Sequence, residues 1–356
     1  ECLDLILKIE SEEKSMKSLY AIDVGIGFTK RAYRQDVDSE MTIKSEASTL
    51  APVPNHAESE DLTKVSFIDL DFAYYMGNEA HQSDASFLPP FDEEIENYYE
   101  SERFKQQIFG CIAKDYKENV VLPLVVTGLP VTCFGSQHEQ LQRALKKETS
   151  VQIDGKFIHI TVENALILQQ PVALHAYFLK EGIIQERDRI LIIDGGFRTV
   201  EMTDMKQNVI LNHYEAELGC SKPLKNIKNI VQNHEGESNQ LHINDMPNIL
   251  EKGYECREEN HETSQVHTLI QKELDAHFQD VMRVLQEQFK LEQYNTIIWT
   301  GGIVDLHKKR IEKMQSEISS FRMVDASKEA ALHGYYIIGS QVFEDITNQS
   351  AYESKL

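Results

Sequence analysis

Short apolar runs that end in glycine turns recur along the chain, and each predicts a buried strand. The three clearest runs, each with the turn that follows it, are 19–22 before Asp23-Val-Gly25-Ile-Gly27, 189–193 before Asp194-Gly195-Gly196, and 295–299 before Thr300-Gly301-Gly302. Ligands of open α/β sheets bind at the carboxyl ends of the strands, so these turns are candidates for a binding edge. The same order of strand, Asp and Gly turn in both halves of the chain also indicates a duplicated architecture.

The rest of the pattern predicts an α/β fold. Further strands are predicted at 120–129, 157–162 and 166–168, and helices at 102–117, 136–147, 171–181 and 262–291. The last helix has an apolar stripe, which we interpret as its core-facing side, formed by Leu269, Leu274, Phe278, Val281, Met282, Leu285 and Phe289. Two polar segments, 36–87 and 233–264, are predicted to be exposed insertions and not core layers.

The chain is acidic, since 58 Asp and Glu residues against 36 Lys and Arg residues give a formal net charge of -22 over 356 residues. A surface of this charge repels phosphate backbones and anionic lipid, which argues against direct nucleic-acid binding and against a membrane partner. The sequence has neither an apolar run of about 20 residues nor a secretory signal, so we predict a cytoplasmic protein. Its five cysteines are scattered without a Cys-x-x-Cys pair and are predicted to be reduced and mostly buried.

The glycine turns suit phosphate groups, because a tight turn leaves backbone N–H groups unpaired and glycine lets a ligand approach closely. Asp23 and Asp194 each end a predicted strand, where a carboxylate could bind Mg²⁺ directly or through its waters. One such turn alone is more often an ordinary hairpin or strand-to-helix turn. Two of them, together with Thr300-Gly301-Gly302 after a third strand, predict a nucleotide site.

Gln170 lies at a junction between a predicted strand and a predicted helix, and Pro171 is well placed as the first residue of that helix. A side-chain amide at this position could orient an attacking water through one donor and one acceptor, without a shifted pKa. If Gln170 stood by itself, a helix-entry residue that bonds nearby backbone would be the better interpretation.

With these motifs the sequence resembles a known superfamily, the nucleotide-binding proteins that include actin, the large heat-shock chaperones and the sugar kinases. The resemblance is strongest to the ParM-like plasmid-segregation actins, and it extends from Met16 to about Phe343. The segments similar to motifs of that family are Asp23–Lys30 (first phosphate motif), Leu124–Pro130 (a strand and turn), Gln170–Ala173 (connecting motif), Asp194–Glu201 (second phosphate motif), Thr300–Gly302 (adenosine motif) and Ala330–Gly339 (the last helix).

The resemblance implies an actin-like (ribonuclease H-like) fold of two lobes, with the nucleotide in the cleft between the domains. The implied division of the chain is a leader at 1–15, domain I at 16–185 with an inserted subdomain at about 36–105, domain II at 186–345 with one at about 214–290, and a polar tail at 346–356. We expect Met16 to be the natural start and the leader to be non-native, with an amphipathic helix for a partner as the alternative.

The resemblance also assigns roles to the site residues. Asp23 and Asp194 would manage Mg²⁺, Gln170 and Asp194 would be catalytic, with Gln170 orienting the water, and Lys30 would reach the phosphates as a point charge. The full set implied to bind nucleotide is Asp23, Gly25, Gly27, Thr29, Lys30, Gly195, Gly196, Thr199, Lys272, Glu273, Thr300, Gly301 and Gly302.

Parts of this assignment leave alternatives. Lys272 and Glu273 would flank the base or ribose, although solvated charges on a helix are the simpler interpretation of both. Gly195 stands where a bulky aliphatic residue is usual, and the adenosine motif has two glycines where three small residues are common. ATP with Mg²⁺ is therefore expected, and GTP stays open.

The resemblance further implies an ATPase that polymerises head to tail into dynamic filaments and segregates plasmid DNA through a DNA-binding adaptor protein at a centromere. Candidate filament contacts, for most of which packing of a small strand is the simpler interpretation, are Phe67, Ile68, Leu70, Phe72, Tyr74 and Tyr75. Two alternatives stay open. A soluble phosphotransferase like the sugar or acetate kinases would need a catalytic Asp, for which we see no convincing candidate, and a bacterial actin of cell shape or division would need a terminal membrane anchor.

Overall fold

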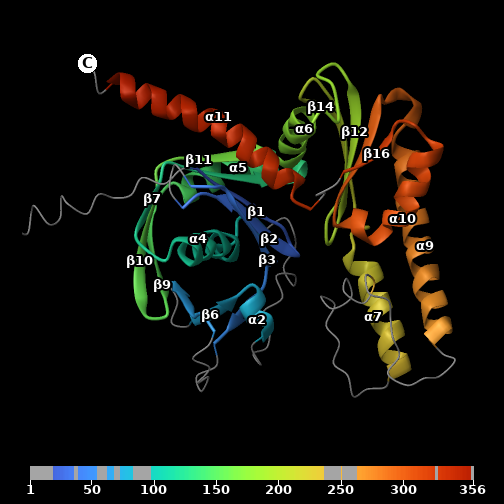
Figure 1. Ribbon diagram of the computed structural model, residues 1–356, viewed down its shortest axis with the longest axis horizontal. Coiled ribbons are helices and arrows are strands. Elements are labelled where there is room, and N and C mark those ends of the chain that lie inside the picture. Colours follow the sequence, from blue (N-terminus) through green and yellow to red (C-terminus); the bar gives the residue numbers. More distant parts are fainter. Residues whose placement is uncertain are drawn as a thin grey trace, which may run out of the picture. The chain divides into compact units, whose positions relative to one another are not determined.

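The computed structural model describes residues 19–35, 39–53, 62–67, 73–82, 98–235, 250, 263–324 and 328–353, which form two compact units (Figure 1). The first unit consists of residues 1–177 and 331–356, and the second of residues 178–330. The predicted leader lies outside the described residues. The sequence placed the domain boundary between residues 185 and 186, whereas the two units meet between residues 177 and 178. Most of the last helix belongs to the first unit.

The first sheet of the first unit carries the first glycine turn. Its strands follow the order β11-β8-β1-β2-β3, with the bounds β1 Leu19–Val24, β2 Phe28–Tyr33, β3 Thr42–Ala47, β8 Leu124–Leu129 and β11 Ala165–Gln169. Strands β1, β8 and β11 are parallel to one another, whereas β1, β2 and β3 form antiparallel hairpins. The carboxyl ends of β1, β8 and β11 therefore lie at one edge of the sheet.

The second sheet of this unit is built partly from the segment that the sequence pattern assigned to an exposed insertion. Its order is β4-β6-β5-β9-β10-β7, with the bounds β4 Leu50–Pro52, β5 Val65–Phe67, β6 Ala73–Met76, β7 Val120–Leu122, β9 Glu148–Ile153 and β10 Lys156–Val162. The prediction for residues 36–87 was wrong, because the described part of that segment supplies four strands and buries Leu50, Val65 and Met76 in the core. Of the proposed filament contacts, Tyr74 and Tyr75 are buried, Phe67 packs against the core, and the other three lie outside the described residues.

Five helices are described in and at the border of the first unit: α2 Asn78–Gln82, α4 Glu102–Tyr116, α5 Val131–Leu145, α6 Gln170–Lys180 and α11 Ala330–Glu353. Figure 1 shows α4 enclosed by strands of both sheets, and the helix contacts β1, β9 and β10. The side-chain oxygen of Ser101 caps α4 by accepting a hydrogen bond from the Phe104 N–H. Helix α5 begins five residues before its predicted start at 136, directly after Pro130.

Helix α11 is fixed to the first unit by close backbone contact. A Cβ atom added at Gly334 would overlap the backbone of Ala173 on α6, and Tyr335 packs directly against Gly128 at the end of β8. Further along the helix, Gly339 lies against Val126. These contacts explain why the last helix packs on the first unit although it follows the second unit in the chain.

The second unit has one sheet and a layer of helices. The sheet has the order β14-β13-β12-β15-β16, with the bounds β12 Arg189–Gly195, β13 Val200–Lys206, β14 Val209–Ala216, β15 Thr296–Gly301 and β16 Phe321–Met323. The helices are α7 Ser221–Glu235, α9 Thr263–Gln288, α10 Gly302–Glu317 and the short 3₁₀ helix η2 Leu291–Gln293. Helix α10 packs on β12, β15 and β16, and α9 packs on α7 and α10.

The predicted apolar stripe of α9 is largely correct, with one exception. Leu274, Val281 and Leu285 are buried in the core of the second unit. Leu269 is 41% exposed, and its neighbour Ile270 is the buried residue on this turn of the helix. Most of the predicted insertion at 233–264 lies outside the described residues.

Two further expectations concern cysteines and membranes. Cys111, Cys133 and Cys220 are buried free thiols, as predicted for the cysteines within the described ranges. No helix in the described part of the chain combines the length and the apolar character that crossing a bilayer requires.

Candidate functional site

The turn after β1 holds Asp23 and Lys30 together. The two residues are direct partners across the β1–β2 hairpin, and Lys30 Nζ lies 2.9 Å from Asp23 Oδ2. The turn is closed by the Gly25 N–H, which donates to the Phe28 carbonyl at 3.1 Å. Asp23 is nearly buried, so the lysine neutralises a carboxylate that would otherwise be costly to desolvate. The same ion pair fixes a cation beside the glycine turn.

Ser48, directly after β3, braces this turn from inside the unit. Its hydroxyl bonds to the Gly25 carbonyl at 2.6 Å, and its N–H donates to the Gly27 carbonyl at 3.1 Å. Thr29, implied to bind nucleotide, is fully buried and its hydroxyl lies 2.7 Å from that of Ser48. Thr29 therefore supports the turn from the core side. No local signal marks Ser48 in the sequence, because its role depends on a partner 23 residues away.

The turn after β12, which lies in the second unit, has the same geometry as the turn after β1 in the first unit. Here the Gly196 N–H donates to the Thr199 carbonyl at 2.9 Å, the same bond to the third following residue that Gly25 makes. Asp194 is the cross-strand partner of Glu201, seven residues later, which is the spacing of Asp23 and Lys30. The two units thus share one turn geometry, but the second places a carboxyl group where the first has a lysine.

Glu201 is the functional candidate that the sequence assignment missed. It lies between Asp194 on β12 and Glu215 on β14 in the cross-strand register. Burial, reinforced by the charges of Asp194 and then Glu215, raises the pKa of Glu201 well above its usual value. His213 Nε2 is 3.9 Å from Glu201 Oε2, and burial lowers the pKa of that histidine, so it stays neutral near pH 7. A row of three carboxyl groups therefore crosses the sheet beside the second turn.

Backbone hydrogen bonds from the segment before α7 hold the second turn in place. The N–H groups of Gly219, Cys220 and Ser221 donate to the carbonyls of Arg198, Gly196 and Phe197 at 2.8, 3.1 and 2.7 Å, respectively. Because all three bonds are between backbone groups, the geometry of the turn does not depend on which side chains stand at positions 197 and 198.

Gly195 and Gly301 are neighbours on β12 and β15, and each is required by its surroundings. A Cβ atom at Gly195 would overlap the Cβ of Ile303 on α10, which takes the space that a bulky residue at position 195 would fill. Gly301 has a φ of 79° and lies against Asp194 Oδ1. The unusual glycine after Asp194 is thus explained by the close packing of α10.

The second and third glycine turns leave the same edge of one sheet. Strands β12 and β15 are parallel, and Asp194 pairs in register with Thr300. Helix α10 begins at Gly302 without a side-chain cap, so its first N–H groups point toward this edge. Backbone N–H groups and the positive end of the helix dipole favour an anion there.

Gln170 is the first residue of α6 and directly follows β11. Since β11, β8 and β1 are adjacent parallel strands, Gln170 and Asp23 lie at the same edge, two strands and about 10 Å apart. The side chain is partly exposed, as an amide that meets a ligand must be.

Lys272 and Glu273 lie on α9 and not at a sheet edge. Glu273 Oε1 accepts a hydrogen bond of 2.7 Å from Asn226 Nδ2 on α7, whereas Lys272 is exposed. Glu273 therefore links α9 to α7 through Asn226. The proposed contacts of Lys272 and Glu273 with a base or ribose stay predictions.

Each unit thus brings its own set of the predicted residues to one edge of a sheet. These sets are Asp23, Gly25, Gly27, Lys30 and Gln170 in the first unit, and Asp194, Gly195, Gly196, Thr199, Thr300, Gly301 and Gly302 in the second.

Comparison with known proteins identifies the fold. Residues 21–172 match the family described as the N-terminal domain of actin-like proteins, and solved structures of bacterial and archaeal actin homologues match along the chain. The chain has an actin-like fold. The resemblance predicted from the motifs is confirmed, and the α/β fold class with it.

Three solved structures illustrate the likeness of this actin-like chain. The apo ParM protein of pSK41 is 18% identical, with a TM-score of 0.66 over 93% of this chain and 99% of that chain. A 15-stranded ParM filament from Clostridium botulinum is 18% identical, with a TM-score of 0.69 over 92% and 99%. The archaeal actin homologue Ta0583 in complex with ADP is 16% identical, with a TM-score of 0.68 over 89% and 97%. No curated protein sequence is similar enough to match the chain.

Proposed function

We propose that this actin-like chain is a nucleoside triphosphatase that assembles into dynamic filaments when it binds nucleotide. The observation that carries the proposal is the repeated turn, in which Gly25 and Gly196 make the same backbone hydrogen bond after an Asp-ended strand. In each unit, such a turn offers backbone N–H groups that suit a phosphate group. The ADP complex of Ta0583 and the ParM filament of C. botulinum are properties of those proteins and support the proposal by likeness of fold.

The residues divide the chemistry among them. Lys30 would neutralise phosphate charge, and the amide of Gln170 would hold a water in line for attack. We assign Mg²⁺ to Asp194 because its cross-strand partner is a second carboxyl group, Glu201, whereas the cross-strand partner of Asp23 is the lysine Lys30. A cation beside Asp194 would offset the charge that the buried Glu201 carries when ionised. When bound, Mg²⁺ would supply charge neutralisation to the phosphates.

The protein alone offers few ligands for the metal. In the described ranges, no group of three or more His, Cys, Asp or Glu side chains is arranged to hold a metal ion. Mg²⁺ typically keeps several waters and binds through one or two carboxylates plus substrate phosphates. We therefore expect Mg²⁺ to bind together with the nucleotide, ATP or GTP, and not in its absence.

The biological role that we propose is plasmid segregation in the bacterial cytoplasm, through a DNA-binding adaptor at a centromere. The net charge of -22 supports an adaptor over direct contact with DNA, because the chain and the phosphate backbone repel each other.

Right-angle light scattering after addition of Mg-ATP, with phosphate release followed in the same sample and Mg-GTP run in parallel, tests the proposal. A rise in scattering that decays as phosphate appears is the expected result. Phosphate release without scattering at any salt or protein concentration would favour a soluble phosphotransferase of the same fold. No binding of either nucleotide would refute the proposal altogether.

A further inference from the structure

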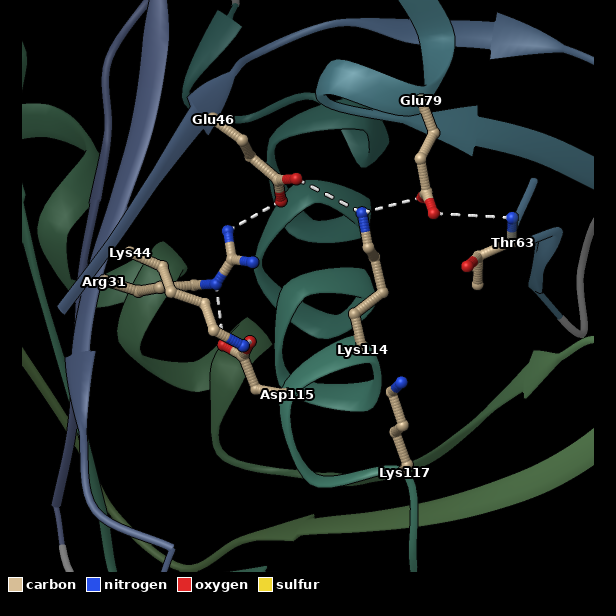
Figure 2. Close-up of a pocket in the computed structure, with 8 residues that line it drawn as sticks. All are labelled: Arg31, Lys44, Glu46, Thr63, Glu79, Lys114, Asp115 and Lys117. Atoms are coloured by element: carbon tan, nitrogen blue, oxygen red, sulfur yellow. Dashed lines mark hydrogen bonds and ion pairs between the residues drawn. The ribbon is translucent and has the colours of Figure 1, made fainter. Parts of the chain in front are cut away.

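A pocket of about 310 Å³ lies within the first unit, and none of its lining residues belongs to a glycine turn. Four of its eight lining residues are cations and three are carboxylates (Figure 2). Pockets of this volume are at the lower end of those that hold small metabolites. A cavity walled almost entirely by charged side chains selects a ligand by charge.

Two of the three carboxylates are paired on both oxygens. Asp115 accepts from Arg31 Nε at 2.6 Å and from Lys44 Nζ at 2.8 Å. Glu46 accepts from Arg31 Nη1 at 2.6 Å and from Lys114 Nζ at 3.2 Å. Arg31, Asp115 and Glu46 are nearly or fully buried, whereas Lys44 is partly exposed, so these pairs form a wall that is mostly shielded from solvent. The wall leaves no carboxylate in need of a further cation.

The third carboxylate, Glu79, is held by the same lysine. Its Oε2 lies 3.1 Å from Lys114 Nζ, and its Oε1 accepts from the Thr63 N–H at 3.4 Å. With Glu79 paired, three cations serve three carboxylates, and the fourth cation, Lys117, is in excess. Figure 2 shows the ammonium of Lys117 directed toward the same space, with no ion pair drawn to it.

Lys117 stands at an unusual place for a lysine. It is the C-cap of α4 with a φ of 57°, held by its N–H bond to the Ala113 carbonyl. Glycine and asparagine are the residues favoured in this left-handed conformation. A lysine there places an exposed ammonium at the rim of the pocket.

We infer that this pocket binds a small anion that carries phosphate or carboxylate groups, of about the size of a tricarboxylate or a sugar phosphate. Among the described residues, three donors of the lining have no bond of their own: Arg31 Nη2, Lys117 Nζ and the Thr63 hydroxyl. Guanidinium and ammonium groups bind oxyanions by charge-assisted hydrogen bonds. The chain as a whole has a net charge of -22 and repels anions. The lining of the pocket, in contrast, has one more cation than carboxylates and therefore attracts an anion.

The pocket shares two strands with the first glycine turn. Lys30 and Arg31 are consecutive on β2, so one side chain faces Asp23 and the other faces the pocket. On the partner strand, Glu46 lines the pocket two residues before Ser48, which braces Gly25. An anion in the pocket would therefore act on the hairpin that carries the turn. This effector role rests on the proposed function, whereas anion binding does not.

Calorimetric titration of the full chain with citrate and with pyrophosphate, in metal-free buffer of fixed ionic strength, tests the binding. The variant Lys117→Glu reverses the excess charge, and Lys146→Glu is its matched control, because Lys146 is the exposed C-cap lysine of α5 in the same unit. We expect the wild type to bind at least one probe, Lys117→Glu to bind it at least about tenfold more weakly, and Lys146→Glu to leave the affinity unchanged.

Three outcomes would overturn the inference. Absence of binding of both probes would make the charged network structural only. Equal weakening by the two variants would show general electrostatic attraction and no specific site. Displacement of the probe by a non-hydrolysable nucleotide analogue would assign it to the glycine turns. If the chain binds no nucleotide, the proposed function fails, but the citrate titration of the two variants still decides the pocket.

Discussion

Asp194 faces Glu201 across the β12–β13 hairpin at the same seven-residue spacing that places Lys30 against Asp23. The duplicated turn therefore carries opposite electrostatics in the two units. In the first unit an ion pair of 2.9 Å balances the aspartate within the protein. In the second unit two carboxyl groups are cross-strand partners, and the charge of Asp194 helps burial to raise the pKa of Glu201. This difference supports our proposal that the first turn contacts phosphate and the second contacts the metal.

The first prediction concerns the pH dependence of stability that Glu201 causes. An unfolded glutamate ionises near pH 4.3, whereas burial raises the pKa of the folded Glu201. Between these two pKa values the folded chain binds more protons than the unfolded chain, so the free energy of unfolding falls as the pH rises. Within that pH range the free energy of unfolding falls by about 1.4 kcal/mol for each pH unit.

Glu201→Gln removes this titration while keeping the shape of the side chain. We expect its unfolding midpoint in metal-free buffer to exceed that of the wild type by more at pH 8 than at pH 5, measured by thermal unfolding followed by circular dichroism. Glu217→Gln is the control, because Glu217 is an exposed carboxylate paired with Arg198. A difference between wild type and Glu201→Gln that does not change with pH would show that Glu201 ionises normally.

The second prediction tests the packing of α10 against the second turn. Gly195→Ala places a Cβ against that of Ile303, and we expect it to lower the free energy of unfolding by about 1–3 kcal/mol. The matched control is Gly302→Ala, where the nearest atoms would lie 3.7 Å away. We expect that change to stay within about 0.5 kcal/mol. Urea unfolding measures both, and similar losses would mean that α10 adjusts freely to the added methyl group.

The parts of this structure that the sequence predicted correctly are those that depend on interactions between residues close together in the chain. Strands β1, β12 and β15 and their turns were predicted because each is a continuous apolar run closed by glycine, a signal contained in about ten residues. Gln170 was placed correctly at a strand-to-helix junction for the same reason, with Pro171 marking the helix start.

Strand β3, in the segment 36–87, was missed because its polar residues have distant partners. Lys44 and Glu46 on β3 line the charged pocket, so the sequence of this strand has a polar, irregular pattern that does not predict a strand. Their partners Arg31 and Asp115 lie 15 and 71 residues away. Glu201 was missed for a related reason, since a glutamate on a strand gives no sign of burial until the neighbouring strands are in place.

The third prediction assigns the metal contact. Asp194→Ala should weaken the binding of Mg-ATP and leave the weaker metal-free binding of ATP nearly unchanged, because it removes a carboxylate and no phosphate donor. Calorimetry with and without Mg²⁺ measures the two affinities, and Glu217→Ala controls for a general loss of negative charge. Unchanged affinity for Mg-ATP would move Asp194 out of the metal shell.

The last prediction separates hydrolysis from assembly. Gln170→Ala should bind nucleotide and assemble, but hydrolyse it about 10- to 1000-fold more slowly, the scale of losing a group that positions a reactant. Gln169→Ala is the matched control, because Gln169 is the preceding, equally half-buried amide at the end of β11. Gln170→Glu restores an acceptor for the water and should recover part of the rate. Filaments of Gln170→Ala should therefore persist longer after a pulse of nucleotide, as scattering that decays slowly. If phosphate release by Gln170→Ala stays at the wild-type rate, another group orients the water. Gln170 then has only a structural role at the sheet edge that also carries Asp23.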